Sequence, residues 1–285
     1  MSFRETVLLG AFAGFTIYLG LPFARLRLLG PRARVALAMF AVGVLAFLFV
    51  DVMEHGFEIV EDAVSGLKDG GESFGHVLGL ALLLGGGFAL GSAGLSILEA
   101  RMRPRSGSPP PMSGASAEIT VEDAAALEDQ AQAARARALR TGMTIAAAIG
   151  LHNFAEGLAI GVSASTGEIS LATVLIVGFA LHNATEGFGI VGPLGSVRPT
   201  WGWLALAGLI GGGPTFIGSM VGYNVTSEPL ELAFYAVSGG AILYVIGEVW
   251  TAMRRYGYRE LGLCLLALGF FVGIATDLIV AYGGG

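Results

Sequence analysis

Long apolar stretches, separated by short charged or Gly- and Pro-containing segments, dominate this chain. A stretch of about 20 apolar residues crosses the roughly 30 Å hydrocarbon core of a membrane as a helix. Such stretches occur at about 6–27, 35–60, 74–99, 140–164, 169–192, 201–223, 230–253 and 259–282. We therefore predict an all-α, polytopic membrane bundle of eight transmembrane helices. The first stretch is expected to be a retained helix, because it is long and no small-residue cleavage site follows it.

The composition agrees with a membrane protein. Hydrophobic residues make up 54% of the chain and charged residues 13%, against roughly 45–50% and 25% in soluble domains. Many of the 45 glycines recur four positions apart inside apolar stretches, as at Gly157 and Gly161. This spacing lets membrane helices pack closely and permits a homodimer. The single cysteine, Cys264, excludes an internal disulfide and a cysteine-based zinc knuckle.

The basic residues indicate how the chain is oriented. All of the 16 except Arg4 and Lys68 fall on alternate inter-helix segments, so the positive-inside rule places both termini outside. Residues 1–100 would then hold helices one to three, and residues 140–285 helices four to eight. Between them, 101–139 would form a cytoplasmic linker.

This linker has two parts. Residues 104–117 are rich in Pro, Ser and Gly and are predicted to be disordered. Residues after Thr120 are Ala-rich, and Asp123 has the spacing of a capping box, so a helix is predicted to begin there and continue into the fourth span. The linker contains no histidine, which favours a solvated tether over a regulatory metal-binding loop.

Two copies of one motif, His-Asn-x-x-Glu-Gly, begin at His152 and His182 in the predicted fourth and fifth spans. A His and a Glu four residues apart project from the same face of a helix. The loop at 165–170 is short, so the two helices should form an antiparallel hairpin. At about 1.5 Å per residue, both motifs lie roughly 20 Å from the outer surface, near the bilayer midplane. Ionisable groups at that depth are a functional-site hypothesis.

The two motifs together offer nitrogen and oxygen ligands for a divalent metal. The candidate ligands are His152, Glu156, His182 and Glu186, with Asn153 and Asn183 as further oxygen donors. Such a mixed set suits zinc, ferrous iron, manganese, cobalt or cadmium better than calcium or magnesium. An isolated His or Glu in a helix bundle is more often a structural hydrogen-bonding partner. The duplication at one depth favours a metal site.

A stripe of polar residues follows the second span toward the outer side. Asp51, His55, Glu58 and Asp62 share one helical face, and an anionic funnel would steer cations toward the deeper motifs. For Glu58 and Asp62, a solvated helix end remains an equal alternative.

Three further acidic residues lie near the ends of other spans. Glu248 is interpreted as an exit ligand or an interfacial charge. Glu99 and Asp277 are expected to be surface-facing caps or ion-pair partners.

The paired motif in this topology resembles the ZIP (Zrt-, Irt-like protein) family of divalent metal transporters. The resemblance implies eight helices arranged as three plus two plus three, outside termini and transport toward the cytoplasm. It also implies that the six motif residues are transport ligands: His152, Asn153, Glu156, His182, Asn183 and Glu186. Further groups from spans two and seven would be Asp51, His55 and Glu248.

The chain departs from the family pattern at three places. The stretch Gly211–Pro214 carries no carboxylate where family members often have Glu before a proline, and Asn183 stands where bacterial relatives often have Asp. A single ion is therefore expected. Ala155 and Thr185 replace the signature prolines, so straighter helices are expected. The Thr185 hydroxyl can still bond to the preceding helical turn.

These observations predict an integral plasma-membrane transporter rather than an enzyme. Its substrate would be zinc, or iron, manganese, cobalt or cadmium, with no organic cofactor and no nucleic-acid partner. No nucleotide-binding loop is present, so ATP drive is not expected, whereas proton coupling is compatible with the ligands. The alternatives are an intramembrane metal-dependent hydrolase, although no His-Glu-x-x-His pair is present, and a metal-sensing receptor.

Overall fold

The computed structural model describes residues 1–26, 30–102, 121–167, 169–224 and 227–282. Within these residues every regular element is helical. The α-helices are α1 (Phe3–Phe15), α2 (Pro31–Lys68), α3 (Phe74–Ala89), α4 (Leu95–Met102), α5 (Val121–Ser165), α6 (Ile169–Val191), α7 (Trp201–Asn224), α8 (Glu228–Arg254) and α9 (Arg259–Tyr282). The disorder predicted for 104–117 lies outside the described residues.

Seven helical stretches in the described part of the chain are long and apolar enough to cross a membrane. The remaining predicted span corresponds to α6, which is 23 residues long. The prediction of a polytopic helical bundle is confirmed, and the chain is an integral multi-pass membrane protein.

Several predicted helix boundaries were wrong. The first span is not one regular helix, because α1 ends at Phe15 and tighter 3₁₀ turns continue to Arg25. Pro22 lies in the second of these turns. A π-helical turn at Leu90–Gly94 separates α3 from α4. Helix α2 continues past the predicted boundary to Lys68, and α5 begins at Val121, as the Ala-rich pattern predicted.

Glycines set the distance between α5 and α7, the two helices with the most extensive contact. A Cβ atom on Gly157 or Gly161 of α5 would collide with the α7 backbone, and one on Gly218 or Gly222 of α7 would collide with the α5 backbone. This is the close approach that the four-residue glycine spacing predicts. Because α5 carries the first motif, the contact determines where that motif sits in the bundle.

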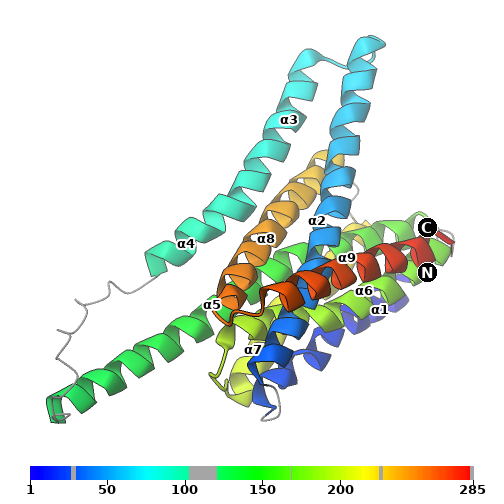
Figure 1. Cartoon of the computed structure of the whole chain (residues 1–285). Helices are drawn as coiled ribbons and strands as arrows, with labels where there is room; N and C mark the ends of the chain where they lie inside the picture. The colour runs from blue at the N-terminus through cyan, green and yellow to red at the C-terminus, as the bar shows by residue number, and fades with distance from the viewer. Residues whose placement is uncertain (27–29, 103–120, 168, 225–226, 283–285) are drawn as a thin grey trace.

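The arrangement of the helices leaves two parts projecting from the bundle. Figure 1 shows the N-terminal part of α5 extending away from the other helices, and the hairpin of α2 and α3 projecting as well. A core of buried apolar side chains, including Leu45 of α2, Ile149 of α5 and Val245 of α8, holds the central helices together.

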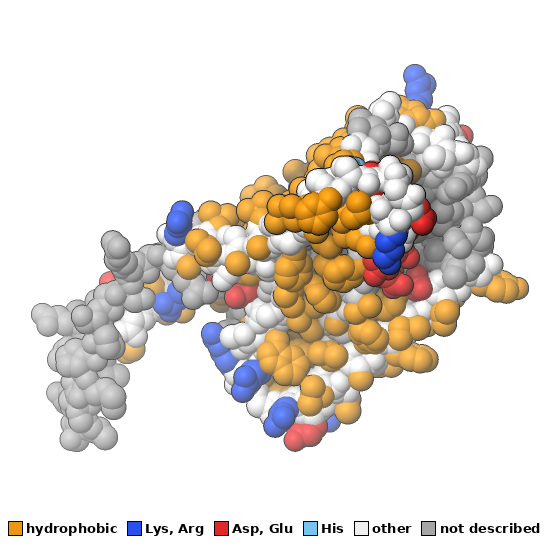
Figure 2. Space-filling model, turned by 90° about the horizontal axis from the view of Figure 1, so that it is seen from above, with side chains coloured by type: hydrophobic (Ala, Val, Ile, Leu, Met, Phe, Trp, Pro, Cys, Tyr) orange, Lys and Arg blue, Asp and Glu red, His pale blue; other side chains and the backbone are white. Residues whose placement is uncertain are grey.

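The outer surface of the bundle is strongly apolar. Large side chains such as Phe12, Leu82 and Phe271 are each more than half exposed. Figure 2 shows hydrophobic side chains forming a wide band over one face, with most Lys and Arg side chains at its margins. An exposed apolar band of this extent is typical of a surface that contacts lipid.

Candidate metal centre

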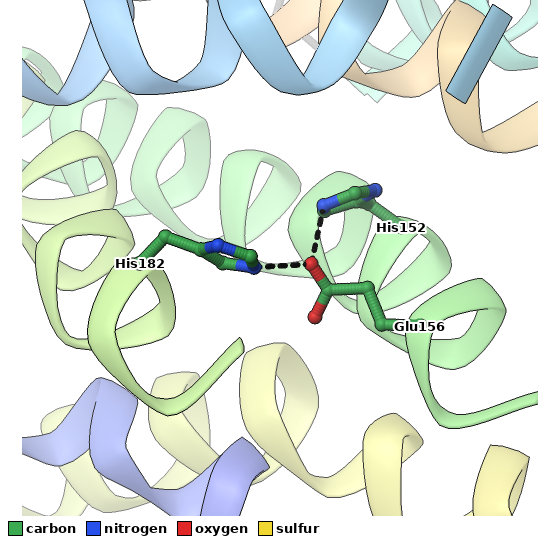
Figure 3. Close-up of side chains that lie close together, drawn as sticks. All are labelled: His152, Glu156 and His182. Carbon is green, nitrogen blue, oxygen red and sulfur yellow. Dashed lines mark hydrogen bonds and ion pairs between the residues drawn. The ribbon is translucent and has the colours of Figure 1, made fainter. Parts of the chain in front are cut away.

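Three ionisable side chains from the two motifs meet inside the bundle. One ligand atom from each of His152, Glu156 and His182 lies within 4.8 Å of the other two. The Oε1 atom of Glu156 is 2.9 Å from Nε2 of His152 and 2.5 Å from Nε2 of His182. Figure 3 shows both imidazole rings directed at this carboxylate oxygen. All three side chains are buried, so a compact nitrogen and oxygen cluster lies away from bulk solvent.

Helix geometry brings these groups together. His152 and Glu156 lie one turn apart on α5, and His182 reaches them from α6. Both helices continue without interruption through the positions of Ala155 and Thr185. The Thr185 hydroxyl donates a hydrogen bond of 2.7 Å to the carbonyl oxygen of His182, as the sequence suggested.

Glu186 lies at the edge of this cluster. Its Oε1 atom is 3.9 Å from Nε2 of His152, and its Oε2 atom accepts a 3.1 Å hydrogen bond from the side-chain amide of Asn153. The Glu186 side chain is almost fully buried. A second carboxylate is therefore held near the His152 imidazole, beside the cluster of three ligand atoms.

The two asparagines of the motifs have different surroundings. Asn153 also donates a 2.9 Å hydrogen bond to the carbonyl oxygen of Gly211, in the α7 stretch where the family resemblance would place a carboxylate. Asn183 instead donates a 3.2 Å hydrogen bond to the carbonyl oxygen of Ala13 and so connects α6 to α1. The structure does not show the Asn183 amide joining the His and Glu cluster, and its expected role as an oxygen donor stays a prediction.

Several buried oxygen atoms around the cluster lack a hydrogen-bond partner among the described residues. They include Oδ1 of Asn153, Oε2 of Glu156 and Oε1 of Glu186. Buried polar atoms are normally paired, because an unpaired one costs free energy of desolvation. Unsatisfied oxygens beside two imidazoles form a donor set suited to a cation of the zinc type.

Ser238 of α8 contacts the far side of the His152 ring. Its Oγ atom lies 3.0 Å from Nδ1 of His152, and the serine is fully buried. Such a contact to the second ring nitrogen orients an imidazole so that its other nitrogen faces a ligand. Sequence reasoning missed this residue, because no local pattern shows which helix a serine in an apolar span will meet.

A cavity of about 360 Å³ lies between the middle of α2 and the cluster. Its lining includes Asp51, His55 and Glu58 of α2 together with His152, Glu156 and His182 of the cluster. Asp51 is half-buried, whereas His55 and Glu58 are exposed. The structure thus brings the first three residues of the predicted polar stripe into one cavity with the motifs.

Asp277 also lines this cavity, from α9, although its side chain is exposed. The exposure agrees with the expectation that Asp277 faces the surface, and its place in the cavity was not predicted. No local pattern near Asp277 indicates that α9 packs against α2.

A second cavity, of about 510 Å³, lies at the arginine-bearing end of the helices. Glu248 lines it, as does Glu99. The prediction that Glu99 faces the surface was wrong, because only 3% of this residue is exposed. Its carboxylate accepts hydrogen bonds from the hydroxyls of Thr141 (3.0 Å) and Tyr244 (2.9 Å), since α4 packs between α5 and α8.

The two cavities share no lining residue in the described part of the chain. On α5, Ile145 and Ile149 lie between them and are almost fully buried. On α8, Ile242 and Val245 occupy the corresponding stretch and are equally buried. In this structure buried isoleucine and valine side chains therefore separate the His and Glu cluster from the cavity at the arginine-bearing end.

Comparison with known proteins agrees with the resemblance seen in the sequence. No family model matches this chain. The chain is 31% identical over 147 residues to a protein named Zinc transporter ZupT from Clostridium perfringens (strain 13 / Type A), covering 50% of this chain and 51% of the relative. The chain spans about half the length of the curated relative it matches. This similarity supports membership of the ZIP family.

Proposed function

We propose that this chain is a ZIP-type transporter that carries a divalent transition-metal ion, zinc foremost, through the cluster of His152, Glu156 and His182. The observation that carries the proposal is this buried cluster of two imidazoles and a carboxylate in a cavity that acidic residues also line. A transport site needs ligands that bind a dication and a path that reaches them. The similarity to a protein named as a zinc transporter supports the same function.

The proposed direction of transport is from the acidic cavity toward the arginine-bearing end. Asp51 and Glu58 would attract the cation, and Glu248 and Glu99 line the cavity at which it would leave. The buried Ile145 and Ile149 block a continuous path. Passage therefore requires helices to move, as in alternating access. Because α5 and α6 carry the ligands, their displacement against α2 and α8 is the proposed motion.

The proposed site holds one ion. The α7 stretch that meets Asn153 offers the Gly211 carbonyl and no carboxylate, so the negative charge needed for a second dication is missing there. Asn183, another expected ligand, is bonded to α1. Two carboxylates, Glu156 and Glu186, balance the charge of one dication.

The decisive experiment is uptake of radioactive zinc by the purified protein in proteoliposomes. We expect uptake that saturates with zinc concentration, and losses of roughly 10- to 100-fold in the variants His152→Ala and Glu186→Ala. Cobalt, manganese, ferrous iron and cadmium, each added as competitor, would rank the substrates. Metal-dependent hydrolysis of a substrate without any ion flux would instead identify an intramembrane hydrolase.

Asp51→Asn should weaken uptake mainly when zinc is scarce. Asp51 lines the cavity and is half-buried. Removing its negative charge lowers the concentration of cations inside the cavity. Steering by charge changes association rates by about tenfold or more, so we expect the apparent KM for zinc to rise by about tenfold with a smaller change in maximal rate.

The matched control for this variant is Asp69→Asn, which removes the same charge from the C-terminal cap of α2 outside the cavity. Equal effects of both substitutions would show that the cavity does not guide the ion.

A further inference from the structure

A groove of about 840 Å³ follows α2 from Phe49 to Glu61 and α3 from Ala81 to Phe88, on the side of α2 that faces α3. None of the three cluster residues lines it. Its lining is apolar over most of its length and acidic along one helix. The apolar residues include Phe49, Val50, Met53, Leu84 and Phe88, and the acidic ones are Glu54, Glu58 and Glu61.

The polarity of the groove changes along its length. At the inner end the rings of Phe49 and Phe88 lie 6.3 Å apart and join the two helices. Glu61 lies twelve residues further along α2, or roughly 18 Å at about 1.5 Å per residue. That length is close to half of the roughly 30 Å hydrocarbon core. With the apolar end near the bilayer midplane, where the sequence places the two motifs, the acidic end would reach the depth of the headgroups.

The protein's own side chains do not fill this groove. Val50 and Phe57 line it and are each about half exposed. A Cβ atom added to Gly85, on the α3 side, would meet no atom within 4 Å. An elongated apolar molecule can therefore lie between α2 and α3.

We propose that the groove binds a phospholipid whose headgroup carries a protonated primary amine, of the phosphatidylethanolamine class. One acyl chain would lie along Phe49, Leu84 and Phe88, and the ammonium would contact Glu58 and Glu61. Three carboxylates repel a lipid with net negative charge and attract an ammonium group. An ammonium also donates three hydrogen bonds, which carboxylate oxygens accept.

A second copy of the chain fits this surface less well. In a twofold dimer the same patch faces itself, so Glu54, Glu58 and Glu61 would lie opposite their own counterparts. Like charges brought together in this way oppose association.

The groove is connected to the proposed ion path. Glu54 and Glu58 line both the groove and the cavity that reaches the metal cluster. A lipid ammonium at these carboxylates would reduce the negative charge that attracts a metal ion. The amine content of the membrane would therefore modulate ion access, a consequence that depends on the proposed transport function, whereas lipid binding itself does not.

Native mass spectrometry of the full-length protein released from detergent tests the lipid site directly. The protein is equilibrated with equal amounts of phosphatidylethanolamine and phosphatidylglycerol of the same acyl composition. We expect preferential retention of phosphatidylethanolamine. The variant Glu61→Gln should lose roughly two- to fivefold of that retention, the effect of one exposed charged contact.

Asp62→Asn is the matched control, because Asp62 neighbours Glu61 on α2 and is also exposed but does not line the groove. It should retain the lipid as the unmodified protein does. Equal retention of the two lipids, or equal losses in the two variants, would overturn the proposal. A lipid-free dimer that dissociates when Gly85 is replaced by leucine would also overturn the proposal, because the groove would then be an interface between two copies of the chain. None of these results depends on zinc transport.

Discussion

Replacing Glu156 by glutamine is expected to reduce zinc uptake at least about 100-fold. Glu156 Oε1 is the oxygen atom that lies between the two imidazoles, and its charge would balance half of a bound dication. Removing one partner of a buried charge pair costs about 3–5 kcal/mol, and each 1.4 kcal/mol is about tenfold in affinity. The amide has nearly the same shape, so the loss should reflect charge rather than volume. Radioactive zinc uptake in proteoliposomes measures the effect.

The matched control is Glu128→Gln, which makes the same chemical change at an exposed position near the start of α5. It should transport zinc as the unmodified protein does. Size-exclusion profiles in detergent would show that both variants are folded. Full uptake by a folded Glu156→Gln protein would contradict the proposed site.

The meeting of His152, Glu156 and His182 could be predicted from local rules. The four-residue spacing places His152 and Glu156 on one face of α5, and the short loop before α6 brings His182 to a similar depth. Both inferences need only helix geometry and loop length. They hold without knowledge of the other helices, which is why the sequence was informative here.

The surroundings of Asn183 could not be predicted in this way. Asn183 follows His182 by one residue and therefore points to a different side of α6. Which helix lies on that side depends on the packing of the whole bundle. The structure places α1 there, and its Ala13 carbonyl accepts the amide hydrogen bond. A neighbour that is distant in sequence thus decides what this side chain does.

Glu99 illustrates the same difficulty near a membrane surface. An acidic residue at the end of an apolar span normally reaches solvent, so the burial of the Glu99 side chain was not expected. The π-helical turn at Leu90–Gly94 precedes α4 and changes the register of the residues that follow it. Glu99 then meets hydroxyls of α5 and α8. Neither the turn nor the two hydroxyl partners has a pattern in the local sequence that predicts this contact.

Gly218→Ala should destabilise the bundle even though alanine is the better helix former. A Cβ atom at Gly218 would collide with the backbone carbonyl of Phe154 on α5, and backbone atoms cannot move aside as a flexible side chain can. Overpacking of this kind costs about 1–3 kcal/mol. We expect the free energy of unfolding to fall by that amount, measured as a lower midpoint in thermal denaturation in detergent.

Gly247→Ala is the comparison that separates packing from helix propensity. Gly247 lies inside α8, and an added Cβ atom would meet nothing within 4 Å. There alanine should stabilise the helix by up to about 1 kcal/mol, so the two identical substitutions should have effects of opposite sign. The sign at Gly218 follows from contact between α5 and α7, which also positions Glu156. A Gly218→Ala protein as stable as the Gly247→Ala protein would show that the two helices do not pack through their glycines.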